Sequence, residues 1–242
     1  MEGRKDYAQY RIELALSLRN GEQLLVNLFI PLGLLIFFSK VKVLNSDDVD
    51  PVEFLAPAVL GLAVMSSALV SLGISTGFER FYGVLKRLGA TPLGRPRWVL
   101  AKFAAVLTIE FGQWAILIPT GLLLGWSPSG GWPTAVLGAV LGTAAFGGLA
   151  LFMAGTLGGM TNLAACNGIY LALMVTGGMV VPFDKMPEAL QAVAKVFPAA
   201  PLADVMIGSL QQGEHVHGAS WLVLTAWAVV MPLLAAWRFS WD

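Results

Sequence analysis

The chain contains 242 residues, of which 57% are hydrophobic and 12% are charged, and its 15 basic and 15 acidic residues give a formal net charge of zero. Ordinary soluble domains carry about 25% charged residues, so this composition excludes a soluble domain and favours a protein that uses the lipid bilayer as its solvent. The zero net charge indicates no nucleic-acid partner, and the single Cys166 excludes an internal disulfide.

The N-terminal segment, residues 1–23, indicates an amphipathic helix on the inner face of the membrane. Residues 1–6 lack the apolar core of a cleavable signal peptide, and we therefore expect the N-terminus to stay in the cytoplasm. The next apolar residues recur at helical spacing among charged ones: Tyr7, Tyr10, Leu14 and Leu18. Arg11 interrupts this stripe, which leaves a plain cytoplasmic extension of the first span as the alternative.

Six apolar segments of roughly 20 residues, the length that crosses a bilayer as an α-helix, follow along the chain. They are residues 24–41, 54–78, 103–126, 134–159, 164–181 and 221–237. We therefore predict an all-α, polytopic membrane protein with six transmembrane helices in a single domain, residues 1–242. Glycines four residues apart in the fourth segment, Gly138 and Gly142, predict a close approach between helices.

Residues 79–102, between the second and third spans, form a strongly basic segment. Six Lys and Arg residues stand against Glu79 alone, and short loops this basic are retained on the cytoplasmic side. This orientation places eleven of the 15 basic residues and both termini in the cytoplasm. Phe81, Leu85 and Leu88 recur at helical spacing and Pro92 ends the pattern, which predicts a short amphipathic helix followed by a bend.

Residues 182–214 contain neither a long apolar run nor a simple loop. Prolines punctuate two short helical patterns, residues 188–196 and 202–210, each too short to cross a bilayer at about 1.5 Å per residue. We predict a helical hairpin that dips into or caps the outer leaflet, where non-helical backbone needs protein around it or water beside it. An interfacial loop that only links two spans is the alternative.

Glu110 is the one acidic residue deep inside a predicted span, with Gln113 and Trp114 close to it on the same helix. An ionisable group at this depth costs several kcal/mol unless it faces a partner, a cavity or water. One interpretation is that these three residues line a substrate route, bind a cationic or polar group, or form a gate. The other is that Glu110 ties neighbouring helices together by hydrogen bonds.

His215 and His217 flank Val216 beside Glu214 in the last outer loop. Two histidines and one carboxylate without a further ligand are weak grounds for a metal site. We therefore predict solvated loop residues and no metal.

Three stretches together resemble the membrane subunit of the ABC-2 type exporters. They are the loop from Glu79-Arg80 to Thr91-Pro92-Leu93, the exit from the fifth span at Gly177-Gly178 to Pro182, and the segment from Met186-Pro187 to Pro198-Ala-Ala-Pro201-Leu202. The resemblance implies that residues 1–23 form an elbow helix and that residues 79–100 contain a coupling helix, which docks on a separate ATP-binding cassette ATPase. The coupling residues would be Glu79, Arg80, Tyr82, Leu85, Lys86, Arg87 and Leu88.

In this interpretation Tyr82, Leu85 and Leu88 seat in a groove of the ATPase, while Arg80, Lys86 and Arg87 meet its acidic residues or anionic lipid. The sequence contains no Gly-x-x-x-x-Gly-Lys-[Ser/Thr] phosphate-binding loop, so ATP and Mg would be bound by the partner and no cofactor by this chain. The resemblance further implies a second permease subunit, the same or different, and a bacterial inner membrane. The cargo would be a hydrophobic or amphipathic drug, lipid or glycolipid moved outward.

Two other functions remain open from the residues. A proton-coupled carrier could use Glu110 as its relay. A membrane enzyme acting on lipid or peptide is disfavoured, because Glu110 and the loop histidines lie at different predicted depths.

Overall fold

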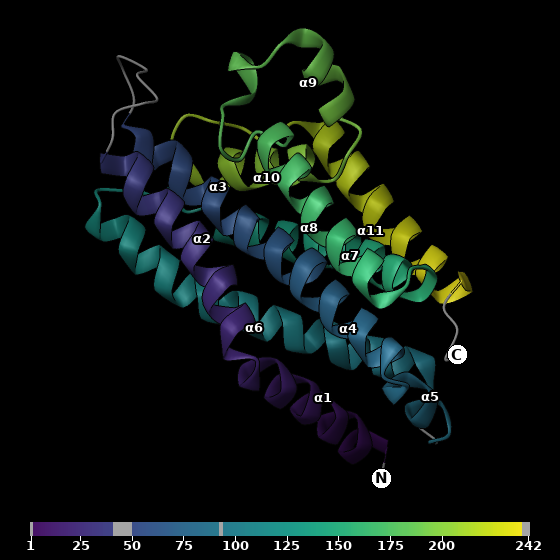
Figure 1. Ribbon diagram of the computed structural model, residues 1–242. Helices are drawn as coiled ribbons and strands as arrows, with labels where there is room; N and C mark the ends of the chain where they lie inside the picture. The colour runs from purple at the N-terminus through teal and green to yellow at the C-terminus, as the bar shows by residue number, and fades with distance from the viewer. Residues whose placement is uncertain (1, 41–49, 92–93, 239–242) are drawn as a thin grey trace.

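The computed structural model describes residues 2–40, 50–91 and 94–238, and every regular element in these ranges is helical (Figure 1). The prediction of an all-α protein is confirmed for this part of the chain. The longer helices are α1 (Glu2–Arg19), α2 (Gly21–Lys40), α3 (Pro51–Met65), α4 (Leu72–Phe81), α6 (Arg95–Leu123), α7 (Trp132–Thr156), α8 (Gly159–Thr176), α10 (Ala199–Leu210) and α11 (Gly218–Arg238). The short elements are η1 (Ser66–Ser71), α5 (Val84–Gly89), η2 (Phe183–Lys185) and α9 (Glu188–Ala194).

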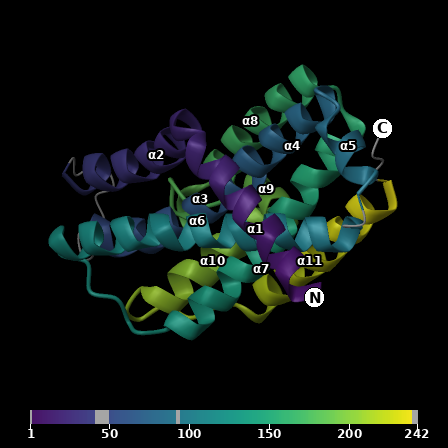
Figure 2. The same ribbon diagram turned by 90° about the horizontal axis from the view of Figure 1, so that it is seen from below.

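The helices form one bundle with two distinct ends. We call the end that carries α5 the α5 end and the opposite one, which carries α9, the α9 end (Figure 1). The N-terminal end of α1 and the C-terminal end of α11 lie toward the α5 end (Figure 1). Helix α1 lies across the N-terminal half of α6, as the view from below shows (Figure 2).

Five helical segments are long and apolar enough to cross a membrane: Gln23–Lys40, Pro51–Phe81, Arg95–Leu123, Trp132–Thr156 and Gly218–Arg238. Helices α9 and α10, bent by 93°, add a sixth if the pair counts as one broken span. The prediction of six spans is therefore confirmed in part: five candidates are present among the described residues, or six if the bent pair is counted.

Helix α8 differs from the predicted fifth span, residues 164–181. It begins at Gly159 and ends at Thr176, where Gly177 and the left-handed Gly178 (φ +76°) follow. Asn162 and Asn167 lower its mean hydropathy, so that this 18-residue helix is not among the five apolar segments.

The two helices predicted between residues 182 and 214 are present as α9 and α10. Helix α10 begins three residues earlier than predicted and is buried against α3 and α7. Helix α9 lies outside the bundle (Figure 1), and the chain just after it is attached to α11 because Trp227 Nε1 donates to the Val196 carbonyl at 2.8 Å.

Glycines on α7 permit the closest helix packing in the core. A Cβ at Gly138 would lie 2.5 Å from Val205 Cγ1 of α10, and one at Gly148 would lie 2.5 Å from the backbone nitrogen of Pro232 in α11. Small residues therefore let α7 approach the side chains of α10 at Gly138, as the glycine spacing predicted, and the backbone of α11 at Gly148.

Candidate functional site

The candidate site lies at the α5 end, where the basic segment emerges from the bundle. Helix α4 ends at Phe81, and Gly83 adopts a left-handed conformation (φ +70°) before α5 begins. A residue without a Cβ takes this conformation at little cost, so the chain can reverse within two residues. The short amphipathic helix predicted from the sequence is thus present, starting at Val84 rather than at Phe81.

The break at Gly83 changes which side chains of the segment are exposed. Phe81 and Tyr82 are 65% and 68% exposed, and Lys86 and Arg87 are exposed as well. Leu85 is fully buried in the core of its own chain, and Leu88 is half-buried against the same core. Leu85 therefore faces the core. Phe81 belongs to α4, so it does not lie on the same helix face as Leu85.

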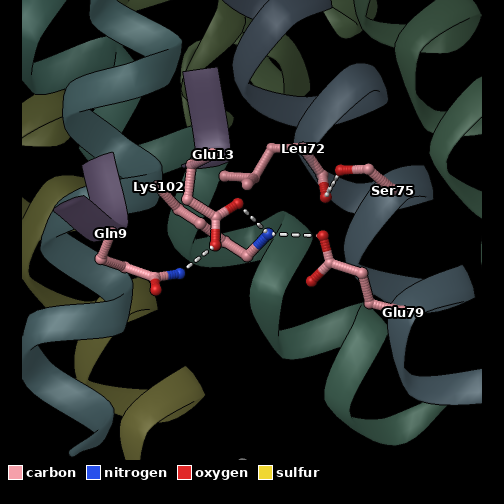
Figure 3. Close-up of polar contacts among 6 residues, drawn as sticks. All are labelled: Gln9, Glu13, Leu72, Ser75, Glu79 and Lys102. Carbon is pink, nitrogen blue, oxygen red and sulfur yellow. Dashed lines mark hydrogen bonds and ion pairs between the residues drawn. The ribbon is translucent and has the colours of Figure 1, made fainter. Parts of the chain in front are cut away.

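Glu79 also faces inward, toward Lys102 at the start of α6. Lys102 Nζ lies 2.8 Å from Glu79 Oε1 and 2.9 Å from Glu13 Oε2 of α1 (Figure 3). Gln9, one turn before Glu13, donates from Nε2 to Glu13 Oε1 at 2.8 Å. We call Glu13, Glu79 and Lys102 the clamp, because one ammonium group joins α1, α4 and α6.

The clamp is shielded from water. Side-chain exposure is 3% for Lys102, 7% for Glu13 and 19% for Glu79, and Lys102 Nζ also lies 5.1 Å from the centre of the buried Trp98 ring. Charges removed from water are expensive unless they are paired, and removal of one partner leaves the others uncompensated. The three helices are consequently held in one geometry by this cluster.

Arg80 connects the end of α4 to the end of α7. Its guanidinium donates to the carbonyl oxygens of Ala154 at 3.3 Å and Leu157 at 3.5 Å. Carbonyl groups at a helix C-terminus lack intrahelical donors and carry partial negative charge, so an arginine there is favourable. Arg80 thus links the end of α4 to the end of α7.

Helix α1 is attached to α6 beyond the clamp. Tyr10 Oη and Thr108 Oγ1 share a hydrogen bond of 3.0 Å, and Arg97 Nε lies 3.6 Å from Asp6 Oδ1. Its exposed side carries the apolar side chains of Tyr7, Ile12, Leu16 and Leu18 together with the charged Arg11. The helix turns Gln9 and Glu13 toward the bundle and presents a mixed apolar and basic surface, which suits a membrane surface.

A polar cavity of about 60 Å³ lies beside the clamp, between α1, α6 and the Pro51–Phe81 helix. Ser67, Ser71, Ser75 and Glu79 line it from one face of the Pro51–Phe81 helix at four-residue spacing. The facing walls come from α1, the residue after it and α6: Glu13, Leu16, Ser17, Asn20, Lys102, Ala105, Val106 and Ile109. A polar space of this size accommodates water.

Glu110, Gln113 and Trp114 are buried farther along α6 and point to three different elements. Thr143 Oγ1 of α7 donates to Glu110 Oε2 at 2.7 Å, and Ser67 Oγ of η1 donates to Gln113 Oε1 at 3.0 Å. Trp114 Nε1 donates to the Leu60 carbonyl of α3 at 3.3 Å. None of the three lines the cavity beside the clamp. Their geometry is that of links between helices.

Sequence reasoning did not identify Glu13 and Lys102 as members of the site. The available signal was Gln9 with Glu13 at i, i+4 in an amphipathic helix, together with a lysine directly before the third predicted span. Only the packing of α1 on α6 brings them together. His217 Nδ1, in the loop before α11, lies 2.7 Å from Asp204 Oδ1 of α10, a pairing that the sequence also did not indicate.

The comparisons with known proteins agree with this architecture. Residues 8–210 match the family described as ABC-2 type transporter. The chain is also 26% identical over 203 residues to "Putative transport permease YvfS" of Bacillus subtilis (strain 168), which covers 77% of this chain and 78% of that protein. This chain is a membrane permease, a transport subunit without an ATPase of its own. The family match spans most of the sequence, and the chain therefore belongs to the ABC-2 type transporter family.

Proposed function

We propose that this permease is the membrane subunit of an ATP-driven exporter and that its α5 end receives the work of a separate ATP-binding cassette subunit. The observation that carries the proposal is the Glu79–Lys102 ion pair, because its partners stand before and after α5 and join both arms of the loop. A force applied to α5 would then reach α4 and α6 together, and α1 through Glu13.

The exposed side chains define the surface that would meet the ATPase. Phe81 and Tyr82 offer apolar area, Met160 at the start of α8 is 68% exposed, and Lys86 and Arg87 add positive charge. Gly159, beside Met160, packs against Phe81, so the two segments adjoin. An apolar groove with an acidic rim is the matching partner chemistry.

The remaining coupling residues would act within the chain. Leu85 and Leu88 hold α5 on the core, Glu79 belongs to the clamp, and Arg80 attaches α4 to α7. The sequence suggested that Leu85 binds in a groove of the ATPase. In this proposal Phe81 takes that role.

Sidedness follows from charge. Lys86, Arg87 and the other basic residues at the α5 end favour a cytoplasmic location, with both termini inside and α9 outside, in a bacterial inner membrane. Helix α8 would then cross as the fifth span, with Asn162 facing protein: its Nδ2 donates to the Gly73 carbonyl of α4 at 2.7 Å. The exposed Asn167 donates to the Leu163 carbonyl of its own helix at 3.0 Å. The α9–α10 pair would be a re-entrant hairpin of the outer leaflet.

A second permease subunit, identical or different, would complete the transport route. The lipid-facing apolar surfaces suit a hydrophobic or amphipathic cargo such as a drug, lipid or glycolipid, moved outward. ATP and Mg would be held by the ATPase alone.

Co-purification tests the docking surface. Tyr82→Glu together with Lys86→Glu should reduce recovery of the co-expressed ATPase, because both changes oppose an apolar groove with acidic edges. The matched control is Val196→Glu with Lys185→Glu, which makes the same charge changes on exposed residues at the α9 end. Equal recovery of the ATPase with both double variants would refute the coupling surface.

A proton-coupled carrier is the second candidate, favoured by one observation. Glu110 is 2% exposed, and its Oε1 has no hydrogen-bond partner among the described residues. Transport that follows a pH gradient without ATP, and that is lost in Glu110→Gln, would support this function over the first.

A further inference from the structure

The Pro51–Phe81 helix changes its winding at one place. Residues Ser66–Ser71 form the π-helical turn η1, in which the Leu72 N–H donates to the Ser67 carbonyl five residues back. A π turn accommodates one extra residue in an α-helix and recurs at functional sites and kinks. This helix therefore has an irregular point between α3 and α4.

The two arms on either side of η1 differ in their surroundings. Every residue of α3 from Leu55 to Met65 is buried. Helix α4, in contrast, has the polar cavity beside it, and its Ser75 is half-buried at the cavity wall. Helix α3, the upper arm, is thus confined by side chains, while α4, the lower arm, has space on one side.

Two kinds of hydrogen bond mark the boundary between these arms. Ser67 Oγ donates to Gln113 Oε1 at 3.0 Å and fixes η1 to α6. Ser66 Oγ donates to the Ala63 carbonyl at 3.3 Å and Ser75 Oγ to the Leu72 carbonyl at 3.1 Å. Serine hydroxyls that bond to the preceding turn weaken and bend a helix. The Ser67–Gln113 bond therefore fixes η1 to α6. The backbone weakened by Ser66 and Ser75 lies at the start of η1 and beyond its end.

We propose that η1 is a joint about which the lower arm, α4 with α5, swings into the polar cavity when the ATPase closes. Ser67 and Gln113 are positioning residues that keep the joint fixed to α6. The clamp limits the swing at the α5 end, where Lys102 holds Glu79. This inference rests on the proposed function, since the ATPase supplies the push.

Cysteine labelling tests the movement directly. With the buried Cys166 replaced by alanine, Ser75→Cys places a thiol on the cavity wall. In the complex with its ATPase, we expect methanethiosulfonate ethylammonium to label this thiol about tenfold more slowly with ATP and vanadate than without nucleotide, the factor of a strong population shift. Ser127→Cys, exposed at the α9 end, is the control and should label equally in both states.

Deletion of Ala68 tests whether η1 is the joint. The deletion removes the extra residue and restores continuous α-helical winding, with both arms still on their original faces. ATP should then leave the labelling rate of Ser75→Cys unchanged, while the ATPase still co-purifies. If ATP still slows the labelling of Ser75→Cys tenfold in the deletion variant, η1 is not the joint.

If the Ala68 deletion variant does not fold, the labelling of Ser75→Cys in the chain without the deletion still tests the swing. If the ATPase binds and ATP does not slow the labelling of Ser75→Cys, the swing into the cavity is refuted. Failure of the ATPase to co-purify at all would instead refute the proposed function.

Discussion

Lys102 Nζ and Glu79 Oε1 lie 2.8 Å apart although 23 positions separate the two residues, and the whole of α5 lies between them. This ion pair ties the two sides of the loop together at its base. The same lysine contacts Glu13, so α1 is tied to the same point.

Lys102→Met tests the cost of opening the clamp. The change leaves Glu13 and Glu79 buried without their cation, and we expect a loss of about 3–5 kcal/mol in the free energy of unfolding. Thermal or denaturant unfolding in detergent measures it, with Lys185→Met as the exposed control. The triple change Glu13→Gln, Glu79→Gln and Lys102→Met should recover most of the loss. A normal stability of Lys102→Met would contradict the clamp.

Glu13→Ala should release α1 without unfolding the bundle. The helix then keeps its Tyr10 and Asp6 contacts with α6 but loses its buried ion pair. Trypsin should cleave after the exposed Arg11 and Arg19 several times faster, because cleavage requires local opening. Glu188→Ala, on α9, should leave the cleavage rate unchanged; if the two variants are cut alike, Glu13 does not hold α1.

Glu110→Gln should preserve the link between α6 and α7. The amide oxygen can still accept the hydrogen bond from Thr143, so we expect stability within about 1 kcal/mol of the parent, whereas Thr143→Val should lose about 1 kcal/mol. A double-mutant cycle between the two positions measures the coupling. Retention of ATP-driven export by Glu110→Gln would indicate a structural residue, and its loss at normal stability would indicate the substrate route.

Gly148→Ala should separate α7 from α11. The new Cβ would lie 2.5 Å from the backbone nitrogen of Pro232, and overpacking of this kind costs about 1–3 kcal/mol. Gly168→Ala in α8, where nothing lies within 4 Å of the added Cβ, should stabilise by up to about 1 kcal/mol through helix propensity. Melting temperatures that shift in the same direction for both variants would contradict the packing at Gly148.

Local pattern was sufficient to predict the helices but not their ends. The all-α fold, the short helix after the second span and the pair α9–α10 follow from apolar runs, glycines and prolines. Helix α8 lies five residues earlier than expected, because the glycines at 177 and 178 end it before the apolar run ends at Val181.

The interior of the site required contacts that periodicity does not contain. Leu85 and Phe81 have the spacing of one helix face, yet the left-handed Gly83 separates them onto α4 and α5. Glu13 and Lys102 are 89 positions apart, so no local pattern indicates their pairing. The positions of Glu110 and Gln113 on one helix were evident, but their partners Thr143 and Ser67 come from other helices.

Arg80 connects α4 to α7, and α7 in turn contacts α11. Its guanidinium holds the end of α7, the glycine contact at Gly148 joins α7 to α11, and Trp227 of α11 holds the chain after α9. These contacts connect the α5 end, through α7 and α11, to the chain after α9. A tilt of α4 that carries Arg80 is therefore expected to displace α9, so that an event at one face of the bundle changes the shape of the other.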